Sequence, residues 1–203
     1  MNFKTMIILS TFVSVLFSCT SAEKERWNHP CEAVSKFECH SLGVSLSKLD
    51  KTKEALDVFK FNCERNNAGP SCVNAGVESY KEAEIREAIR FYEIGCSLGE
   101  GLGCSNRACF LDPTSGCEKV GLTDIKLAQD YYVKGCELRE AVSCYNYGLL
   151  MRKIGDEDIS SKAFAVGCSL GDIDSCNESK GKKASDGFEI LKTESQKSKK
   201  TRR

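Results

Sequence analysis

The stretch FKFNCERNNAGPSCVNAG, residues 59–76, places Cys63 and Cys72 on either side of a turn rich in Asn, Gly and Pro. The first cysteine closes a segment with helical periodicity, and the second opens another such segment. The arrangement recurs along the chain once Cys19 is set aside. Six consecutive pairs are eight or nine residues apart: Cys31 and Cys39, Cys63 and Cys72, Cys96 and Cys104, Cys109 and Cys117, Cys136 and Cys144, Cys168 and Cys176.

Four of these pairs follow a segment with one shared pattern. A small residue lies eight positions before the first cysteine, an aromatic residue four before it, and Gly or Asn one before it. Positions i, i+4 and i+8 share one face of an α-helix, so each segment is predicted to be helical. Thr52 and Asp124 are the predicted N-caps of two of these helices. The four segments are residues 55–63, 88–96, 128–136 and 160–168.

The residues after the second cysteine predict a second helix in each repeat. A small residue falls four positions after the thiol, at Gly43, Gly76, Ala108 and Gly148. Such a residue lets a neighbouring helix come close. Successive first cysteines of these repeats are 32, 33, 40 and 32 residues apart, the period of helical-hairpin solenoids. We therefore expect an all-α fold: an α/α solenoid of about five hairpin repeats related to tetratricopeptide repeats.

The cysteines explain how such an array could be held together. Where one helix ends and the next begins, the two thiols of a pair face each other across the turn, so a disulfide can join consecutive repeats. Each would contribute about 2.5–3 kcal/mol in the chain-entropy account. Cys109 and Cys117 lie in the longest repeat, around FLDPTSG, and are predicted to staple a loop to itself. Zinc would favour thiols two to four residues apart, so we expect neither a metal site nor another cofactor.

Composition limits the function classes. The 203 residues carry 29 basic and 29 acidic side chains, so no strong field favours nucleic acid. Thirteen cysteines indicate an oxidising compartment. Residues 1–22 resemble a secretory signal, and Cys19 also fits a lipoprotein attachment site. We expect the solenoid over residues 23–180, a basic disordered tail over 181–203, no transmembrane span, and a monomer.

Residues with catalytic potential are few. His29 and His40 lack metal-site spacing and are interpreted as surface histidines. Ser45 and Lys48 fit the S-x-x-K pattern of β-lactam-active enzymes, but the S-D-N and K-T-G partners are missing. The cysteine spacing favours structural staples over thiol catalysis. No catalytic residue is therefore predicted, and β-lactam or thiol-redox activity stays an alternative.

One recurrent polar feature suggests a binding surface. Asn74, Asn106 and Asn146 each lie two positions after the second cysteine of a pair. They could form a row of amides on the concave face, where helical solenoids bind their partners. Alternatively, each amide could brace a hairpin by bonding to the backbone.

The segments KFNCERNNAGPSCVNAG (60–76) and AQDYYVKGCELREAVSCYNYGLL (128–150) resemble the cysteine-rich Sel-one-like repeat family. The resemblance covers about residues 28–180. It is closest to the branch of animal cytochrome c oxidase assembly factors, and more distant to the Helicobacter cysteine-rich, β-lactamase-like proteins. It implies a protein-binding scaffold that assists assembly of respiratory complex IV in the mitochondrial intermembrane space. The signal-like residues 1–22 do not match that branch. They favour the alternative of a secreted or lipid-anchored protein with an extracellular partner.

Overall fold

A computed structural model describes residues 29–117, 121, 123–179, 187 and 193. Within this part the chain forms nine helices and no strand. The helices are α2 (Lys36–Lys48), α3 (Thr52–Asn66), α4 (Gly69–Lys81), α5 (Ile85–Ser97), α6 (Gly101–Leu111), α7 (Ile125–Glu137), α8 (Ala141–Lys153), α9 (Glu157–Ser169) and α10 (Ile173–Glu178).

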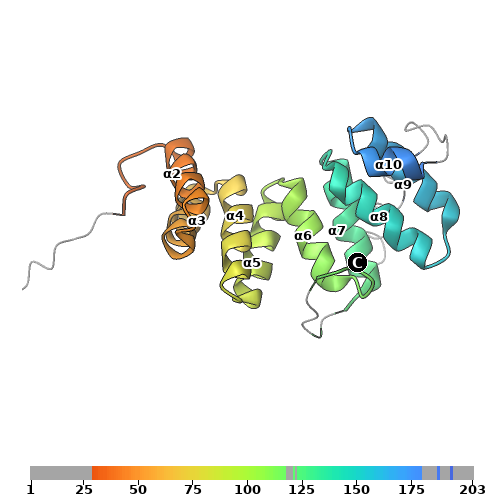
Figure 1. The fold of residues 1–203 in the computed structure, drawn as a ribbon, viewed down its shortest axis with the longest axis horizontal. Helices are drawn as coiled ribbons and strands as arrows, with labels where there is room; N and C mark the ends of the chain where they lie inside the picture. Colours follow the sequence, from red (N-terminus) through yellow and green to blue (C-terminus); the bar gives the residue numbers. More distant parts are fainter. Residues whose placement is uncertain (1–28, 118–120, 122, 180–186, 188–192, 194–203) are drawn as a thin grey trace, which may run out of the picture.

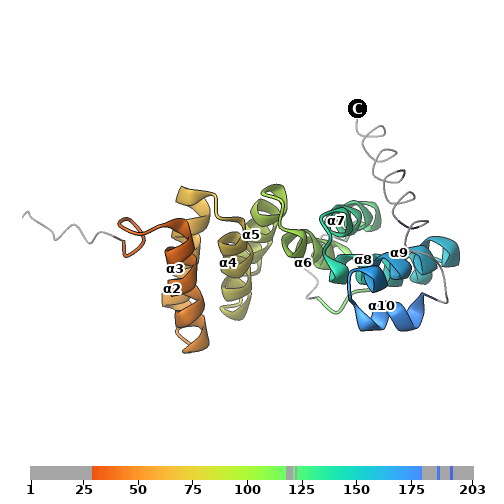
Figure 2. The same ribbon diagram turned by 90° about the horizontal axis from the view of Figure 1, so that it is seen from above.

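Consecutive helices pack as antiparallel hairpins, and the hairpins follow one another from one end of the molecule to the other (Figures 1 and 2). The helices α4, α6 and α8 each contact the odd-numbered helix before them and the one after them, while α2 pairs with α3 and α10 with α9. Successive even-numbered helices touch as well, from α2 to α10, and so form one continuous layer. The fold is therefore the expected all-α solenoid, with four full hairpins and α10 as the first helix of a fifth.

Six disulfides are present in this array. Four join an odd-numbered helix to the even-numbered helix of the next repeat: Cys63–Cys72, Cys96–Cys104, Cys136–Cys144 and Cys168–Cys176. Their Cα atoms are only 4.4–4.8 Å apart, because the turn between the helices brings the two ends together. The remaining two disulfides, Cys31–Cys39 and Cys109–Cys117, do not connect helices of neighbouring repeats.

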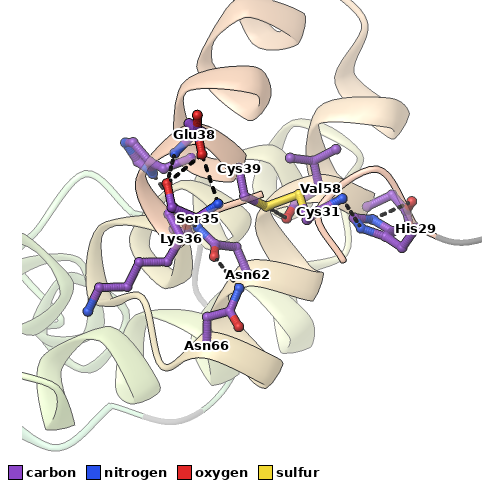
Figure 3. Close-up of a disulfide and its surroundings, with 12 residues drawn as sticks. His29, Cys31, Ser35, Lys36, Glu38, Cys39, Val58, Asn62 and Asn66 are labelled. Atoms are coloured by element: carbon purple, nitrogen blue, oxygen red, sulfur yellow. Dashed lines mark hydrogen bonds and ion pairs between the residues drawn. A yellow bond between two sulfur atoms is a disulfide. The ribbon is translucent and has the colours of Figure 1, made fainter. Parts of the chain in front are cut away.

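The first disulfide ties a turn, and not a preceding helix, to α2 (Figure 3). His29 shapes this turn: its Nδ1 accepts a hydrogen bond from the Cys31 amide at 3.1 Å, and its ring stacks on Phe61 at 3.9 Å between centroids. Its Nε2 lies 3.2 Å from a carboxylate oxygen of Asp57 on α3. His29 therefore anchors the start of the solenoid to the first hairpin.

Cys109 was expected in a loop, and this expectation was wrong. Cys109 belongs to α6, and only Cys117 lies in the segment that follows. Helix α6 ends at Leu111 because Pro113 disfavours helical backbone just before it. The Asp112 carboxylate then accepts the Thr114 amide at 2.7 Å, which starts a turn. The disulfide fixes this inserted turn to the helix.

Small residues set the distance between the helices of a hairpin. A Cβ atom added to Gly76 would lie 2.6 Å from the ring of Tyr92, and the same relation joins Gly43 to Phe59 and Gly148 to Phe164. These rings are the aromatic residues four positions before the first cysteine, and all are buried. The two sequence patterns therefore meet: the ring of each odd-numbered helix fills the space left by the glycine of its partner.

A second close approach lies beside the disulfides. Added Cβ atoms at Gly135 and Gly167 would collide with Ser143 and Ser175 of the next helix, at 2.8 and 2.9 Å from their Cβ atoms. Where the first repeat has Asn62 in place of glycine, the amide is fully buried and donates to the Lys36 carbonyl and to the Ser71 hydroxyl, at 2.8 and 2.7 Å. The Gly-or-Asn pattern thus reflects helix contact at the stapled end.

The expected caps are partly correct. Asp124 is the N-cap of α7, and its carboxylate accepts the Leu127 amide at 2.9 Å. Thr52 is instead the first residue of α3, whose N-cap Lys51 makes no side-chain capping bond. Residues 1–22, Cys19 and most of 181–203 lie outside the described residues. Of the predicted tail, Gly187 is described and is buried beside Val166 of α9.

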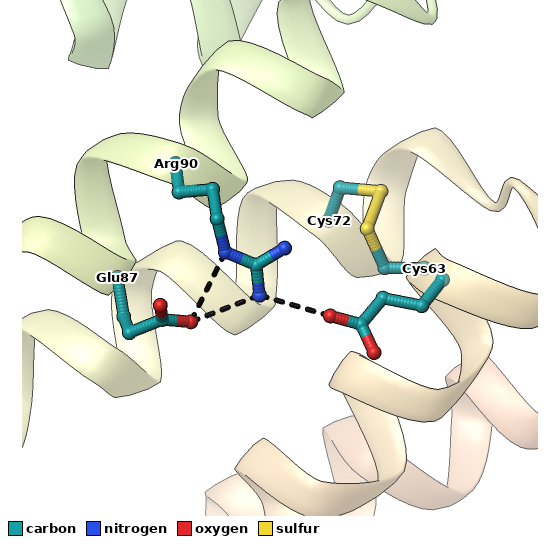
Figure 4. Close-up of polar contacts among 5 residues, drawn as sticks. Cys63, Cys72, Glu87 and Arg90 are labelled. Carbon is teal, nitrogen blue, oxygen red and sulfur yellow. Dashed lines mark hydrogen bonds and ion pairs between the residues drawn. A yellow bond between two sulfur atoms is a disulfide. The ribbon is translucent and has the colours of Figure 1, made fainter.

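Charged side chains also link neighbouring repeats on the odd-numbered helices. The Arg90 guanidinium donates to Glu87 on its own helix and to Glu64 on α3, both at 2.9 Å, next to the Cys63–Cys72 disulfide (Figure 4). The hydrogen bond from Arg90 lowers the pKa of the Glu87 carboxyl below its usual range. All three side chains are about 40% exposed, so water screens this network and its contribution to stability is small.

Candidate binding face

Each of the even-numbered helices α2, α4, α6 and α8 has a side that points away from the cysteine near its start. On α4, α6 and α8 this cysteine is bonded to the preceding helix, and on α2 it is bonded to the preceding turn, so the cysteine marks the inward direction. Residues two before, two after, five after and nine after the cysteine lie about 140–200° around the helix from it. We call the surface formed by these positions on α2, α4, α6 and α8 the even-helix face.

The even-helix face carries the same chemistry in almost every repeat. The first position is apolar and exposed, the second is Ser or Asn, the third is apolar and half-buried, and the fourth is an exposed lysine wherever the helix is long enough to have it. In chain order the first row is Phe37, Pro70, Leu102 and Val142, and the second row is Ser41, Asn74, Asn106 and Asn146. The third row is Val44, Val77, Cys109 and Leu149, and the fourth row is Lys48, Lys81 and Lys153.

The three candidate asparagines therefore lie in one row on adjacent helices. Asn146 donates from Nδ2 to the Ser105 hydroxyl of α6 at 3.4 Å, so this amide braces two repeats. The side chains of Asn74 and Asn106 are half-buried and make no hydrogen bond within the described part of the chain. Neither of these two amides caps a helix or bonds to backbone. Two of the three amides are thus available to a partner.

One lysine of the fourth row is held in place by a buried acid. Glu78 is 2% exposed, and its Oε1 accepts from Lys81 at 2.8 Å and from the Ser47 hydroxyl at 2.7 Å. This contact joins α2 to α4 at the end opposite the disulfides. The buried carboxylate balances Lys81, so the even-helix face keeps only the charges of Lys48 and Lys153 in this row.

The S-x-x-K residues form no catalytic arrangement in the described residues. Ser45 donates its hydroxyl to the Ser41 carbonyl of its own helix at 2.9 Å, and both Ser45 and Lys48 are exposed. Burial also raises the pKa values of two tyrosines in the core, Tyr92 and Tyr132. Burial raises the pKa of Tyr92 to about 12, and the charge of Glu78 adds to the effect.

His40 was interpreted as a surface histidine, but it is half-buried between α2 and α4. Its Nδ1 lies 2.9 Å from the Ser71 hydroxyl, and its ring packs near Phe59. Burial lowers the pKa of the His40 imidazole below its ordinary value of 6.5. The ring is therefore neutral in the folded protein near neutral pH.

This shift predicts a loss of stability in mild acid. Below pH 6.5 the unfolded chain binds a proton at His40 that the folded chain does not, so the free energy of unfolding falls as the pH drops from 6.5 towards the lowered pKa. We expect His40→Gln, which can still bond to Ser71, to flatten the decline of Tm between pH 7 and pH 5. An unchanged profile in His40→Gln would contradict this account.

Comparisons with known proteins leave the family of the chain open, since neither a family model nor a curated protein matches it. In the part of the chain that the structure describes, no group of three or more His, Cys, Asp or Glu side chains is arranged to hold a metal ion. No described helix is both long enough and apolar enough to cross a membrane. The six disulfides indicate an oxidising compartment.

Proposed function

We propose that this chain is a non-catalytic scaffold that binds a protein partner along its even-helix face. The observation that carries the proposal is the row of Asn74 and Asn106 on adjacent helices, with both amides free of internal hydrogen bonds. A half-buried amide next to apolar side chains can donate to and accept from a peptide backbone. Repetition along the solenoid suits a partner segment that is itself extended.

The resemblance described for residues 60–76 and 128–150 extends the proposal to a process. On that basis the partner belongs to the machinery that assembles cytochrome c oxidase, and the compartment is the mitochondrial intermembrane space. The signal-like residues 1–22 support a second candidate, a secreted or lipid-anchored scaffold with an extracellular partner. Both compartments are oxidising and both are compatible with the disulfides.

Substitutions on the even-helix face test the scaffold proposal. The double variant Asn74→Ala, Asn106→Ala is expressed in the cells from which the chain comes, and its partners are cross-linked to it. The amount of cross-linked partner should fall about tenfold or more, because each lost hydrogen bond costs about 0.5–1.5 kcal/mol of binding free energy. The control carries Lys134→Ala and Glu137→Ala on α7, which are exposed but lie outside this face. Partners retained by the asparagine variant, or lost equally by the control, would contradict the proposal.

A second measurement separates the two candidate processes. The first reading is the location of the chain, imaged with its native N-terminus. The second is the amount of assembled cytochrome c oxidase in cells that lack the chain. Mitochondrial location with reduced oxidase supports the assembly role. Location in the secretory route with unchanged oxidase supports the extracellular scaffold.

A further inference from the structure

A cavity of about 440 Å³ opens at the disulfide end of the first two repeats. Its walls are the start of α2, the turn between α3 and α4, and the turn between α5 and α6. The apolar part consists of Phe37, Pro70 and Leu98, and Phe37 and Pro70 also belong to the even-helix face. The cavity is therefore continuous with the face proposed to bind the partner.

The carboxylate of Glu100 lines this cavity and does not cap the helix that follows it. Glu100 is the N-cap of α6 but makes no side-chain capping bond. The equivalent residue of the next repeat, Glu140, does cap its helix by accepting the Val142 amide at 3.4 Å. Glu100 lies instead against Gly69, where an added Cβ atom would be 2.6 Å from Glu100 Oε1. Gly69 thus makes room for the carboxylate at the cavity wall.

The Glu100 carboxylate has no partner of its own. Within the described residues no hydrogen bond or ion pair involves its side chain, although it is partly buried. Lys36 lines the same cavity, but within the described residues it forms no ion pair with Glu100. Burial lowers the pKa of His40 on the α2 wall, which disfavours a positive charge there. A partly desolvated carboxylate without a counter-charge favours the approach of a cation.

The side chains around this carboxylate narrow the choice of cation. Phe37 is 76% exposed and Leu98 is 39% exposed, so an aromatic ring and an aliphatic surface are both free beside Glu100. A guanidinium pairs with a carboxylate through two parallel hydrogen bonds and stacks on aromatic rings, while its methylene stem covers apolar surface.

We propose that this cavity binds an arginine side chain of the partner, with Glu100 as the counter-ion and Phe37 as the stacking surface. This inference rests on the proposed scaffold function and adds the chemistry of one anchor residue. It predicts that partners of this chain present an arginine within the extended segment that lies on the even-helix face.

Two small ligands test the proposal on the full chain. N-acetyl-arginine amide and N-acetyl-citrulline amide have nearly the same shape but differ in charge. In titrations followed by the amide signals in ¹⁵N NMR, the arginine ligand should give saturable shifts at residues 36–40, 67–69 and 98–100. It should bind about threefold or more tightly than citrulline, the range of an exposed ion pair with a cation–π contact. No saturable shift, or equal binding of the two ligands, would overturn the proposal.

Matched variants assign the preference to the cavity. Glu100→Gln should abolish the preference for arginine over citrulline, whereas Glu140→Gln, the same change at the next repeat, should leave it unchanged. Phe37→Ala should weaken arginine binding about threefold without changing Tm, since the ring is mostly exposed. A preference that survives Glu100→Gln would refute the assignment. If arginine fails to bind while Asn74→Ala with Asn106→Ala still loses partners, the anchor is wrong and the scaffold function stands.

Discussion

Reduction of all six disulfides is expected to unfold the solenoid at room temperature. Each closes a loop of eight or nine residues and contributes about 2.5 kcal/mol in the chain-entropy account. Six such contributions reach about 15 kcal/mol, the upper end of the stability of an ordinary domain. The buried apolar residues form four separate clusters along the array, so no single large core remains to compensate. Circular dichroism at 222 nm with and without a phosphine reductant measures the loss.

Two double variants show which disulfides matter most. Cys136 and Cys144 join α7 to α8 and are fully buried, whereas Cys109 and Cys117 tie α6 to the turn after it and are half-buried. Both pairs close loops of equal length, so chain entropy alone would make the two changes equivalent. We expect alanine at Cys136 and Cys144 to lower Tm by about 5–15 °C, because the disulfide that joins two repeats is lost.

Alanine at Cys109 and Cys117 should lower Tm by less than half as much, since the inserted turn can open without separating repeats. Full helicity and an unchanged Tm after complete reduction would refute the role assigned to the disulfides. An equal Tm loss in the two double variants would instead show that their position in the solenoid is irrelevant.

Gly76→Val is expected to lower the free energy of unfolding by about 3 kcal/mol or more. The first added carbon would already lie 2.6 Å from the ring of Tyr92, which is itself 5% exposed and has no free space to enter. A β-branched residue adds two further carbons and would separate α4 from α5. Thermal unfolding should show a Tm decrease of about 6–12 °C.

The matched control is Gly116→Val, at a glycine whose added Cβ atom would meet nothing within 4 Å. This change should shift Tm by no more than about 2 °C. Ala108, which occupies the position of Gly76 in the third repeat, shows that a single methyl group can be accommodated beside Tyr132. Gly76→Ala should therefore cost less than Gly76→Val, and a valine variant as stable as wild type would contradict the packing described here.

Much of this fold follows from the sequence because its signals are local and repeated. Each aromatic residue four positions before a cysteine, such as Tyr92, and each small residue four positions after one, such as Gly76, marks a helix face. The cysteine spacing then shows which helix ends are close. What the two patterns could not tell is that they meet each other within one hairpin, because that contact depends on how the helices cross.

The sequence predictions failed at residues that differ from the corresponding residues of the other repeats. Cys109 was assigned to a loop because Pro113 follows closely, but proline disfavours helical backbone at the residue before it, Asp112, and α6 continues as far as Leu111. Arg107 stands where the second repeat has Ala75, and nothing in the sequence indicates that it is only 9% exposed. Its guanidinium lies over the Tyr131 ring at 5.5 Å, and its Nε is 3.8 Å from Glu93. Such burial depends on neighbours from three helices.

The candidate site also has features that the sequence predicts and others that only the structure reveals. The asparagine row was visible as a repeated position, and the structure adds that Asn74 and Asn106 are free while Asn146 is not. Glu100 and Glu140 are indistinguishable in sequence, since both precede an even-numbered helix by one residue. Their different roles arise from side-chain orientation, because Gly69 leaves space for one carboxylate and the backbone amide of Val142 holds the other.

The fold depends on the pairing of consecutive cysteines, with four of the pairs joining one repeat to the next. A non-reducing peptide map of protein purified from its own cells tests this pairing. Proteolysis separates the two cysteines of every pair, because a cleavage site lies between them. Trypsin cleaves at Lys36, Arg65 and Arg139, and proteases specific for Asp or Glu cleave at Glu100, Asp112 and Asp172. We expect six linked peptide pairs and no alkylation of these cysteines before reduction. Links between non-consecutive cysteines, or several free thiols, would contradict it.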